Sequence, residues 1–562
     1  MKYDAIVIGG GPNGLVAAAT LGRLGERVLL LEGRDTLGGR LAPLASWPGF
    51  KLPGVLHSVG RLRPKVAREL GIDGGVVPHD PVVFSPHPDG RWLAVWRDER
   101  QTARDLARLS PRDARRYPEY QAFVRRLSSF ASALLDMSPP PLGTPDLSQF
   151  LDVAQLGIRF RLLGKADMIR AMRLATTCVA DFLGEWFSTD LLKASLAAPA
   201  LWGLTCGPWA AGTGATLLYN ALEGPFGMPK GDLVGRLVGA AQRWGGEIRR
   251  QSPVDEILLD GSRVTGVRLA NGEVVEATRV FSALDPKRTF LELIRPWHVA
   301  PGFSRQIRHY HSRGVTARLL LAVEGLPEFH ALRGVPKAEA ARLLGGRIHL
   351  GPSLDDLERA SDEAKYGRYS RQPMMEMLIP SLTDASVAPA GQHLLSLMVQ
   401  WAPYELREGY WDDRREAFAD DVVRALETYM PGLSNRIKAR HVTTPLDMER
   451  SLGLTQGHIH HGEHSLHQLL VARPVPAVAQ YASPIDNLYL CGAGVHPGGG
   501  ISGAPASNAI HAALDSTARP AVGPVGTGLA VLGAGLAVGV AVRALNRKNG
   551  KDSSHGNSDT LS

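Results

Sequence analysis

Cysteine is scarce in this chain. Three cysteines occur in 562 residues, and Cys178, Cys206 and Cys491 lie far apart, with no Cys-x-x-Cys pair among them. This spacing excludes a disulfide framework, a redox-active dithiol and a zinc site built from four cysteines.

The chain also lacks a basic stripe interleaved with aromatic side chains. Its formal net charge is +8, but the arginines are scattered and aromatic residues make up only 6%. We therefore expect a solvated surface and no nucleic-acid partner. The first strand begins at Tyr3, which leaves no room for a signal peptide ahead of it and favours a cytoplasmic location. No repeat of solenoid length is present.

A glycine-rich turn, Gly-Gly-Gly-Pro-Asn-Gly at residues 9–14, is the first strong motif. It follows an apolar run that is typical of a buried parallel strand, and it opens a segment with helical spacing at residues 13–24. A second strand at residues 28–31 ends at Glu32, eighteen residues past the last glycine of the turn. A bare GxGxxG motif is a weak signal, but strand, helix, strand and acid in this order predict a dinucleotide site.

Each residue type in this unit has a physical role. Gly9 allows the tight turn, Gly11 lets the backbone approach a pyrophosphate, and Gly14 lets helix and strand pack closely. The phosphates are expected at the helix N-terminus, where backbone N–H groups are unpaired. Glu32 is placed to accept hydrogen bonds from a ribose hydroxyl.

The loop at residues 33–40 follows directly and contains Gly38-Gly39-Arg40, a tight backbone passage beside a cation. Residues 7–40 resemble the FAD-binding entry of the glutathione-reductase-type flavoproteins, in the branch that holds amine oxidases and phytoene desaturases. The resemblance implies that Glu32 binds the adenosine ribose and that the Gly-Gly-Arg loop runs beside the flavin diphosphate. NAD is less favoured, because a plain NAD-binding fold does not explain this loop.

A second strong motif closes the chain. A strand ends in glycines at residues 487–494, and residues 495–503, Val-His-Pro-Gly-Gly-Gly-Ile-Ser-Gly, lead to a helix. This block happens to contain GxGxxG, but no strand and acid follow, so we reject a second dinucleotide. We expect the helix N-terminus to face the pyrimidine end of a flavin. Ala493 stands where many flavoproteins carry an acid for the ribityl chain.

The closing block resembles the flavin-binding C-terminus of bacterial-type phytoene desaturases. Together with residues 401–404 and 473–476, it most resembles the group of pyridine nucleotide-disulfide oxidoreductase domain-containing protein 2, over residues 1–516. In this branch the residue matching Val254 holds the adenine through its backbone. Motif and resemblance together assign the following cofactor-binding residues: Gly9, Gly11, Pro12, Asn13, Gly14, Glu32, Gly33, Arg34, Gly38, Gly39, Arg40, Val254, Gly492, Gly494, Pro497, Gly498, Gly500, Ile501 and Gly503.

The expected fold is α/β, with a glutathione-reductase-type, Rossmann-like FAD-binding domain interleaved with a mixed-sheet substrate domain and a helical cap. The FAD-binding domain is predicted from three parts, and the substrate domain from the segments between them. The boundaries are 1–80, 223–300 and 481–517 for the FAD-binding parts, 81–222 for the helical cap, and 301–480 for the substrate domain. The cap, rich in Leu, Ala, Phe and Met, is either plain helical core or a cover over an apolar channel that touches a bilayer.

The C-terminal tail is treated separately. Residues 521–542 carry no charge and are long enough to cross a hydrocarbon core of about 30 Å, with a GxxxG pair at Gly535 and Gly539. We expect membrane association through this segment, since a full crossing conflicts with a cytoplasmic catalytic body and a basic tail end. Residues 549–562 are expected to be disordered.

Five histidines between His458 and His467 raise the question of a metal site. Glycines within this segment and the absence of a nearby cysteine argue against one, and we predict no metal. The segment is expected to line the flavin or substrate site instead. His57, Arg63 and His461 are candidates for the flavin's substrate side, and no catalytic residue is identified.

The leading hypothesis is an FAD-dependent oxidoreductase that moves hydride between a carbon–carbon bond of an apolar, isoprenoid-like or other lipid substrate and flavin N5. Its electron acceptor is open among quinone, oxygen and nicotinamide. Two alternatives remain: an amine-oxidase-like flavoenzyme for a smaller polar substrate, and a membrane-associated protein that keeps FAD without turnover.

Overall fold

The first of two large sheets forms the expected nucleotide-binding domain. The computed structural model describes residues 2–140, 147–224 and 226–517. The sheet runs in the order β7-β2-β1-β10-β9-β8, and β16 pairs with β10. Its strands are β1 (Tyr3–Ile8), β2 (Val28–Leu31), β7 (Glu247–Arg249), β8 (Val254–Asp260), β9 (Arg263–Leu269), β10 (Val274–Ser282) and β16 (Leu488–Leu490).

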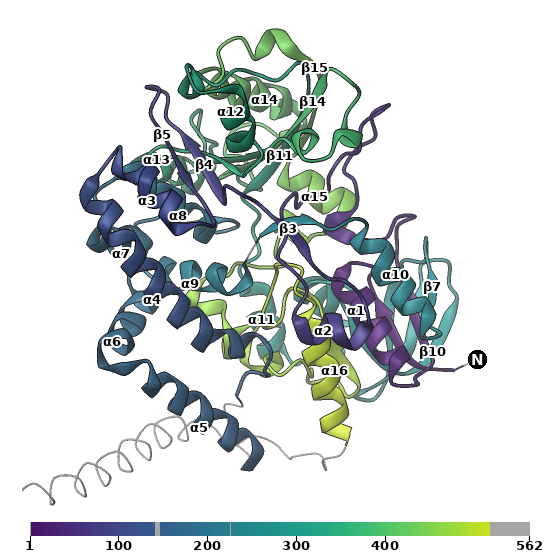
Figure 1. Cartoon of the computed structure of the whole chain (residues 1–562). Helices are drawn as coiled ribbons and strands as arrows, with labels where there is room; N and C mark the ends of the chain where they lie inside the picture. The colour runs from purple at the N-terminus through teal and green to yellow at the C-terminus, as the bar shows by residue number, and fades with distance from the viewer. Residues whose placement is uncertain (1, 141–146, 225, 518–562) are drawn as a thin grey trace, which may run out of the picture.

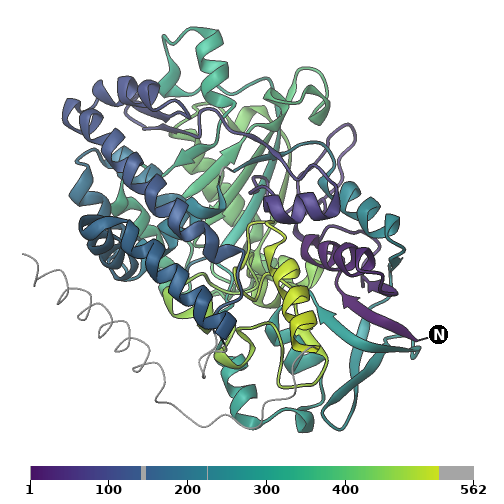
Figure 2. The same ribbon diagram turned by 60° about the horizontal axis from the view of Figure 1, so that its bottom comes forward.

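The central strands of this sheet are parallel and buried, which explains their continuous apolar runs. β1 pairs in parallel with β2 and with β10, and β16 joins β10 in parallel from more than two hundred residues later in the chain. Residues of 1–80, 223–300 and 481–517 thus share one sheet. Its helices are α1 (Pro12–Arg23), α2 (Pro64–Leu70), α10 (Leu233–Arg243), α11 (Pro301–His309) and α16 (Ala504–Thr517). Figure 2 shows α16 beside α1, the two ends of the described chain side by side.

The second sheet is mixed, as expected. Its order is β15-β11-β14-β13-β12-β4-β5, and the pairing of β12 with β4 is parallel while the others are antiparallel. The strands are β4 (Val83–Pro86), β5 (Trp92–Val95), β11 (Thr316–Glu324), β12 (Ile348–Leu350), β13 (Met375–Leu378), β14 (Gln392–Gln400) and β15 (Ile437–Thr443). The accompanying helices are α12 (Lys337–Leu344), α13 (Leu354–Lys365), α14 (Trp411–Glu427) and α15 (Pro445–Leu452). Strands β4 and β5 form an antiparallel hairpin.

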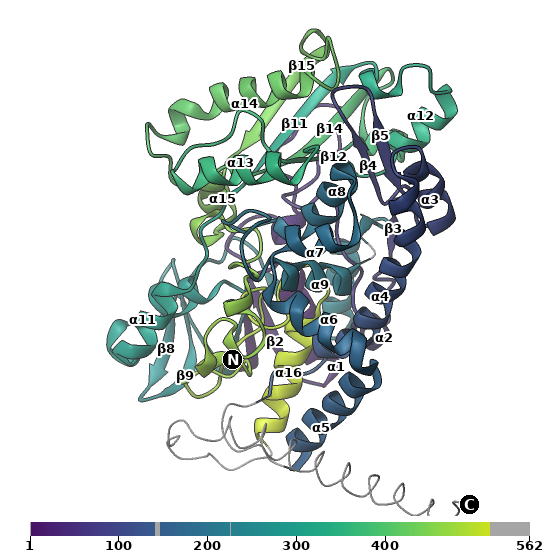
Figure 3. The same ribbon diagram turned by 90° about the vertical axis from the view of Figure 1, so that its left-hand side faces the viewer.

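A helical region occupies one side of the molecule (Figures 1 and 3). It consists of α3 (Glu99–Ala107), α4 (Pro111–Leu135), α5 (Leu147–Leu162), α6 (Gly164–Thr176), α7 (Val179–Trp186), α8 (Asp190–Leu201) and α9 (Thr213–Glu223). An apolar core of aromatic side chains, including Tyr120, Phe123 and Trp186, joins α4 to α7. A two-stranded ribbon, β3 (Val76–Pro78) with β6 (Gly227–Pro229), links residues 1–80 to residues 223–300.

Of the helices in the described ranges, none combines the length and apolar character that a membrane crossing requires. Residues 521–542, for which the sequence predicts membrane association, and the tail 549–562 lie outside the described residues. The predicted fold class, a Rossmann-like domain interleaved with a mixed-sheet domain and a helical region, is confirmed.

Candidate functional site

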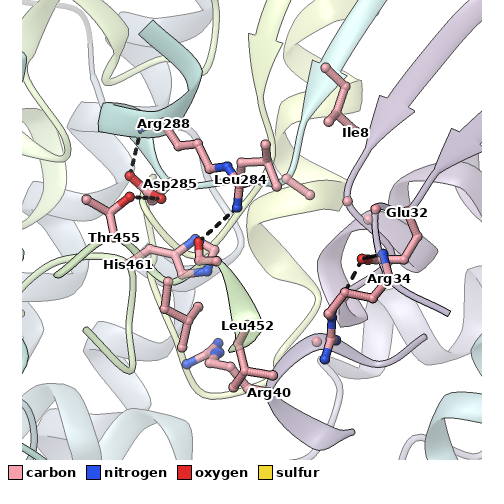
Figure 4. Close-up of a pocket in the computed structure, with 18 of the residues that line it drawn as sticks. Ile8, Glu32, Arg34, Arg40, Leu284, Asp285, Arg288, Leu452, Thr455 and His461 are labelled. Carbon is pink, nitrogen blue, oxygen red and sulfur yellow. Dashed lines mark hydrogen bonds and ion pairs between the residues drawn. The ribbon is translucent and has the colours of Figure 1, made fainter. Parts of the chain in front are cut away.

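A cavity of about 470 Å³ lies at the carboxyl ends of the parallel strands of the first sheet. Parallel sheets characteristically bind ligands at this edge. Residues from both ends of the chain line the cavity, so its walls come together only in the folded protein (Figure 4). The predicted cofactor residues that line it are Gly9, Gly11, Pro12, Asn13, Gly14, Glu32, Gly33, Arg34, Gly39, Arg40 and Val254.

The glycine turn has the geometry that a pyrophosphate site needs. Gly9 adopts φ +100°, and a Cβ added at Gly14 would lie 1.8 Å from the carbonyl oxygen of Gly9. A Cβ added at Gly39 would lie 3.0 Å from the Cα of Gly11, so the two loops pass each other with room for backbone only. Helix α1 begins at Pro12 with no side-chain cap, and its first N–H groups have no intrahelical partner. The positive end of the helix therefore faces the cavity.

Glu32 is held by two backbone donors. Its Oε2 accepts from the N–H of Gly10 at 2.8 Å, and its Oε1 accepts from the N–H of Arg34 at 2.9 Å. The side chain is nearly buried and lines the cavity. Each carboxylate oxygen has a second lone pair, so a ribose hydroxyl can still donate to it.

The opposite wall comes from distant segments. Figure 4 shows Asp285, Thr455 and His461 across the cavity from Glu32. Asp285 Oδ2 accepts from Thr455 Oγ1 at 2.6 Å, and its Oδ1 accepts from the N–H of Arg288 at 3.0 Å. Burial raises the pKa of Asp285 despite these donors.

His461 is the one member of the histidine segment that lines this cavity. Its backbone is left-handed, with φ +57°, and its buried Nδ1 has no hydrogen-bond partner among the described residues. Burial and the nearby charges of Arg40 and Arg473 hold the pKa of His461 well below its ordinary value. The imidazole is therefore neutral and offers one free ring nitrogen toward the cavity's edge.

The polar groups of this cavity fit an FAD. In the residue ranges that the structure describes, Oδ1 of Asn13 and Nδ1 of His461 are buried without a hydrogen-bond partner, and a ligand with polar groups at both ends would satisfy them. Arg40 is almost buried and donates to the carbonyl oxygen of Ile459, so its charge stays at the cavity wall. The glycine cradle, the helix N-terminus and Glu32 supply the remaining contacts that a dinucleotide requires.

The closing glycine block is buried beside the cavity, but only Ala493 lines it. Gly498 packs against His464 and Tyr219, whose hydroxyl donates to the carbonyl oxygen of Pro497 at 2.6 Å. Gly492 lies so close to β10 that an added Cβ would be 2.5 Å from the carbonyl oxygen of Ala283. The predicted residues outside the lining are Gly38, Gly492, Gly494, Pro497, Gly498, Gly500, Ile501 and Gly503, and their part in flavin binding stays a prediction.

The histidine segment shows no metal geometry. Within the described part of the chain, no group of three or more His, Cys, Asp or Glu side chains is arranged to hold a metal ion. His458 Nε2 donates to the carbonyl oxygen of Gly203 at 2.9 Å, while its Nδ1 accepts from the N–H groups of His460 and Gly462. Its role is to shape the loop that carries His461.

Two of the three substrate-side candidates lie away from this cavity. His57 is buried against the second sheet, where its Nδ1 accepts from Arg318 at 3.1 Å and its Nε2 lies 3.3 Å from Glu376. Arg63 pairs with Asp136 at the end of α4. Neither residue is among those lining the cavity.

Several lining residues were not singled out from the sequence. Asp285 follows the end of a parallel strand, and that position was an available signal for a ligand contact. No local motif marks Arg288 or the loop from Leu452 to Thr455. These residues reach the cavity only through the packing of a helical turn and a connecting loop. The lining residues missed in this way are Pro253, Leu284, Asp285, Arg288, Glu292, Glu449, Arg450, Ser451, Leu452, Gly453, Leu454 and Thr455.

Comparisons with known proteins place this geometry among oxidoreductases. Residues 7–61 match the family model of the NAD(P)-binding Rossmann-like domain. Pyridine nucleotide-disulfide oxidoreductase domain-containing protein 2 of Rattus norvegicus is 34% identical over 542 residues, which cover 91% of this chain and 93% of the relative. The neurosporene-forming phytoene desaturase of Cereibacter sphaeroides is 26% identical and covers 91% of this chain and 94% of its own. The crystal structure of an oxidoreductase from Methanosarcina mazei shares the fold, with TM-score 0.56, 15% identity and coverage of 92% and 100%.

Proposed function

This chain belongs to the family of pyridine nucleotide-disulfide oxidoreductase domain-containing protein 2 and is an FAD-dependent oxidoreductase; we propose that it acts on a carbon–carbon bond of an apolar, isoprenoid-like or other lipid substrate. The resemblance inferred from the motifs is thereby confirmed. Despite the family name, the three cysteines are far apart in sequence and form no disulfide, so we propose no dithiol chemistry.

One observation supports the cofactor part of the proposal: a single cavity joins the glycine turn and Glu32 at one end to Ala493 and His461 at the other. A bare adenine nucleotide would need only the first group. Contacts from residues more than four hundred positions apart suit a longer dinucleotide whose redox ring lies toward the C-terminal segments.

The chain's own residues bind and orient the cofactor in this proposal. Glu32 accepts from the adenosine ribose, and the backbone at Val254 pairs with the adenine edge. The first N–H groups of α1 hold the pyrophosphate, with Arg40 adding positive charge beside it.

When bound, the flavin supplies hydride chemistry at N5. His461 is held neutral, so it can form one hydrogen bond at that end of the cavity without adding a charge. Formation of a carbon–carbon double bond would remove a hydride from one carbon and a proton from its neighbour, and the proton would pass to water or a side chain; we assign no residue as its acceptor.

The substrate class rests on the relatives. Those named phytoene desaturase, such as the protein of Cereibacter sphaeroides, are named for an apolar isoprenoid substrate and align over most of this chain. We extend that class to this protein, together with membrane association through residues 521–542, which would bring the enzyme to such substrates. The electron acceptor in this proposal is a quinone, oxygen or a nicotinamide.

The test begins with the cofactor. Purified protein is expected to release FAD on denaturation, identified by chromatography, and folded protein that neither contains nor takes up FAD would contradict the assignment. The holoprotein is then incubated anaerobically with fractionated lipid extracts and separately with a panel of amines. Bleaching of the flavin absorbance with lipids, and mass-spectrometric loss of two hydrogens from the consumed lipid, supports the proposal. Bleaching by amines alone would replace it with the amine-oxidase-like alternative.

A further inference from the structure

Helix α5 contributes no buried side chain at any of its described positions, residues 151 and 153–162. Several of these side chains are nevertheless both apolar and exposed: Leu151 is 58% exposed, Val153 40%, Ile158 62% and Leu162 79%. Single exposed aliphatic residues are ordinary on protein surfaces, but four on one helix with no buried side chain at its described positions form an unusually apolar surface.

The spacing of Leu151, Ile158 and Leu162 puts these three on one stripe, while Val153 lies on the opposite side of the helix. At about 100° per residue, positions 151, 158 and 162 fall within about 40° of one another around the helix. Phe160 lies on the opposite side and packs against Phe130 of α4, with ring centroids 5.4 Å apart. The aliphatic stripe therefore points away from the body of the protein.

Cations flank the stripe on both sides. Arg159 and Arg161 are exposed and fall about 80° to either side of it. Among the described residues, neither arginine has an ion-pair partner, and the same holds for the exposed Lys165 that begins the next helix. An outward aliphatic stripe with a cation on each flank is the arrangement of a helix that lies in a membrane interface.

Helix α6 also exposes apolar side chains close to a cation. Ile169 is 45% exposed and Met172 54%, three positions apart on one face of α6, and Lys165 precedes Ile169 by one turn. Figures 1 and 3 show α5 at the same end of the molecule as the last turn of α16, from which the chain continues toward the uncharged residues 521–542.

We propose that the outer faces of α5 and α6, which we call the α5–α6 face, dock onto the surface of an anionic lipid bilayer. Leu151, Ile158, Leu162, Ile169 and Met172 enter the boundary between headgroups and acyl chains, while Arg159, Arg161 and Lys165 contact lipid phosphates. This inference concerns a surface in the described part of the chain and does not depend on the proposed activity.

The flanking charges select this occupant over the alternatives. A second copy of this chain would bring the same unpaired cations into contact with one another, which is unfavourable. The uncharged residues 521–542 of this chain offer no anion to the two arginines. A bilayer with anionic headgroups satisfies the aliphatic stripe and its charged flanks together.

The experiment uses the full-length holoprotein and vesicles. Co-sedimentation is measured with vesicles of equal phosphatidylglycerol and phosphatidylcholine, and with vesicles of phosphatidylcholine alone. Two variants change the face: Ile158→Gln with Leu162→Gln, and Arg159→Gln with Arg161→Gln. Two matched controls make the same changes elsewhere: Val77→Gln with Val274→Gln, each 56% exposed, and Arg305→Gln with Arg308→Gln on α11. Flavin content and circular dichroism confirm that every variant folds.

The expected result is binding to the anionic vesicles that weakens at least about tenfold in the aliphatic variant and about 25-fold in the arginine variant, with controls equal to the wild type. Wild-type binding should also weaken at high salt and with neutral vesicles. A wild type that does not bind anionic vesicles, or face variants that bind as well as the controls, would overturn the proposal. Equal binding by all variants would place the membrane contact in residues 518–562 alone.

A second readout tests whether the face is already covered in solution. An environment-sensitive fluorophore attached through Ile158→Cys is expected to show aqueous emission in buffer and a blue shift when anionic vesicles are added. Blue-shifted emission in buffer alone would mean that another segment of this chain or a second copy occupies the face, and would also overturn the proposal.

Discussion

The residue types allowed at single positions of the cavity are restricted in two ways. Some positions lie in close contact with backbone atoms, and others hold a nearly buried carboxylate through hydrogen bonds. Gly14 touches the carbonyl of Gly9, and Glu32 holds two backbone N–H groups on its two oxygens. A substitution of Gly14 therefore affects packing, whereas a substitution of Glu32 affects hydrogen bonding to the ligand. The two effects can be separated experimentally.

We expect Gly14→Ala to destabilise the protein by about 3 kcal/mol and to abolish retention of FAD. The added Cβ would lie 1.8 Å from the carbonyl oxygen of Gly9 and 3.3 Å from Cβ of Ala283, so α1 would have to move off the sheet. Urea denaturation and flavin content measure the change. In Gly239→Ala on α10, the new Cβ meets nothing within 4 Å, and that exposed control should gain about 0.5–1 kcal/mol. A folded, flavin-containing Gly14→Ala protein would contradict the close packing.

We expect Glu32→Gln to weaken FAD binding by about tenfold or more without unfolding the protein. The amide offers one acceptor where the carboxylate offers two, and charged acceptors form stronger hydrogen bonds, worth about 1.5–3 kcal/mol. Fluorescence titration of the apoprotein with FAD measures the affinity. Glu273→Gln, which removes an exposed acid from the turn before β10, should bind FAD as the wild type does. Equal affinities for the two variants would remove Glu32 from the ribose site.

At the scale of elements, the inner face of the second sheet is joined to the nucleotide domain by buried polar side chains. His57 from the first domain meets Ser396 of β14, Arg318 of β11 and Glu376 of β13. Arg347 donates to the other oxygen of Glu376 at 3.2 Å. Burial opposes ionisation of Glu376, yet Arg347 and His57 hold its pKa at about 2.

This network predicts a large cost for Glu376→Gln, about 3–5 kcal/mol, because Arg347 and Arg318 would remain buried without a counter-charge. The free energy of unfolding in urea measures it. Glu324→Gln provides the control, because its partner Lys438 is exposed and the pair lies at the sheet edge. We expect no change in the control's unfolding midpoint. A cost as small as that of the control would show that the network does not join the domains energetically.

At the scale of the whole molecule, buried neutral histidines set the acid stability. Burial lowers the pKa of His57, His349 and His496 to about 4 and that of His458 to about 3, from an ordinary value of 6.5. At His57 and His496, nearby arginines lower the pKa further. The unfolded chain takes up protons at these residues from pH 6.5 downward, whereas the folded chain does so only near pH 4 or below. Stability is therefore complete above pH 6.5 and falls as the pH drops toward 4.

Each such histidine contributes a loss of about 1.4 kcal/mol per pH unit within that window. Urea unfolding at about pH 7.5 and about pH 5 should therefore show a loss of several kcal/mol, before the carboxylates begin to titrate. Replacing one of them, His349→Gln, should flatten the pH dependence by the share of one histidine, whatever its effect on stability at neutral pH. A pH profile that is flat between about pH 6.5 and about pH 5 would contradict this account.

The features of the fold and the site that the sequence predicted are those whose residues lie close together in the chain. The turn at residues 9–14, Glu32 and the Gly-Gly-Arg loop lie within forty residues, and one strand-helix-strand unit positions them. The continuous apolar run ahead of the turn likewise predicted a buried parallel strand of the first sheet, because burial on both faces imposes this pattern on a strand. Residues 81–222 were predicted as one helical cap, but its division into helices α3 to α9 depends on how each segment packs.

The sequence by itself determined the dinucleotide motif and the fold class, because a glycine that touches backbone and an acid at a strand end leave their mark locally. Only the tertiary structure decided that Asp285, Thr455 and His461 form the opposite wall of the cavity, and that His57 packs against the second sheet instead. It also decided that α5 presents its aliphatic stripe outward. The physical reason is that these contacts join residues far apart in the chain, and only the packing of whole elements brings such residues together.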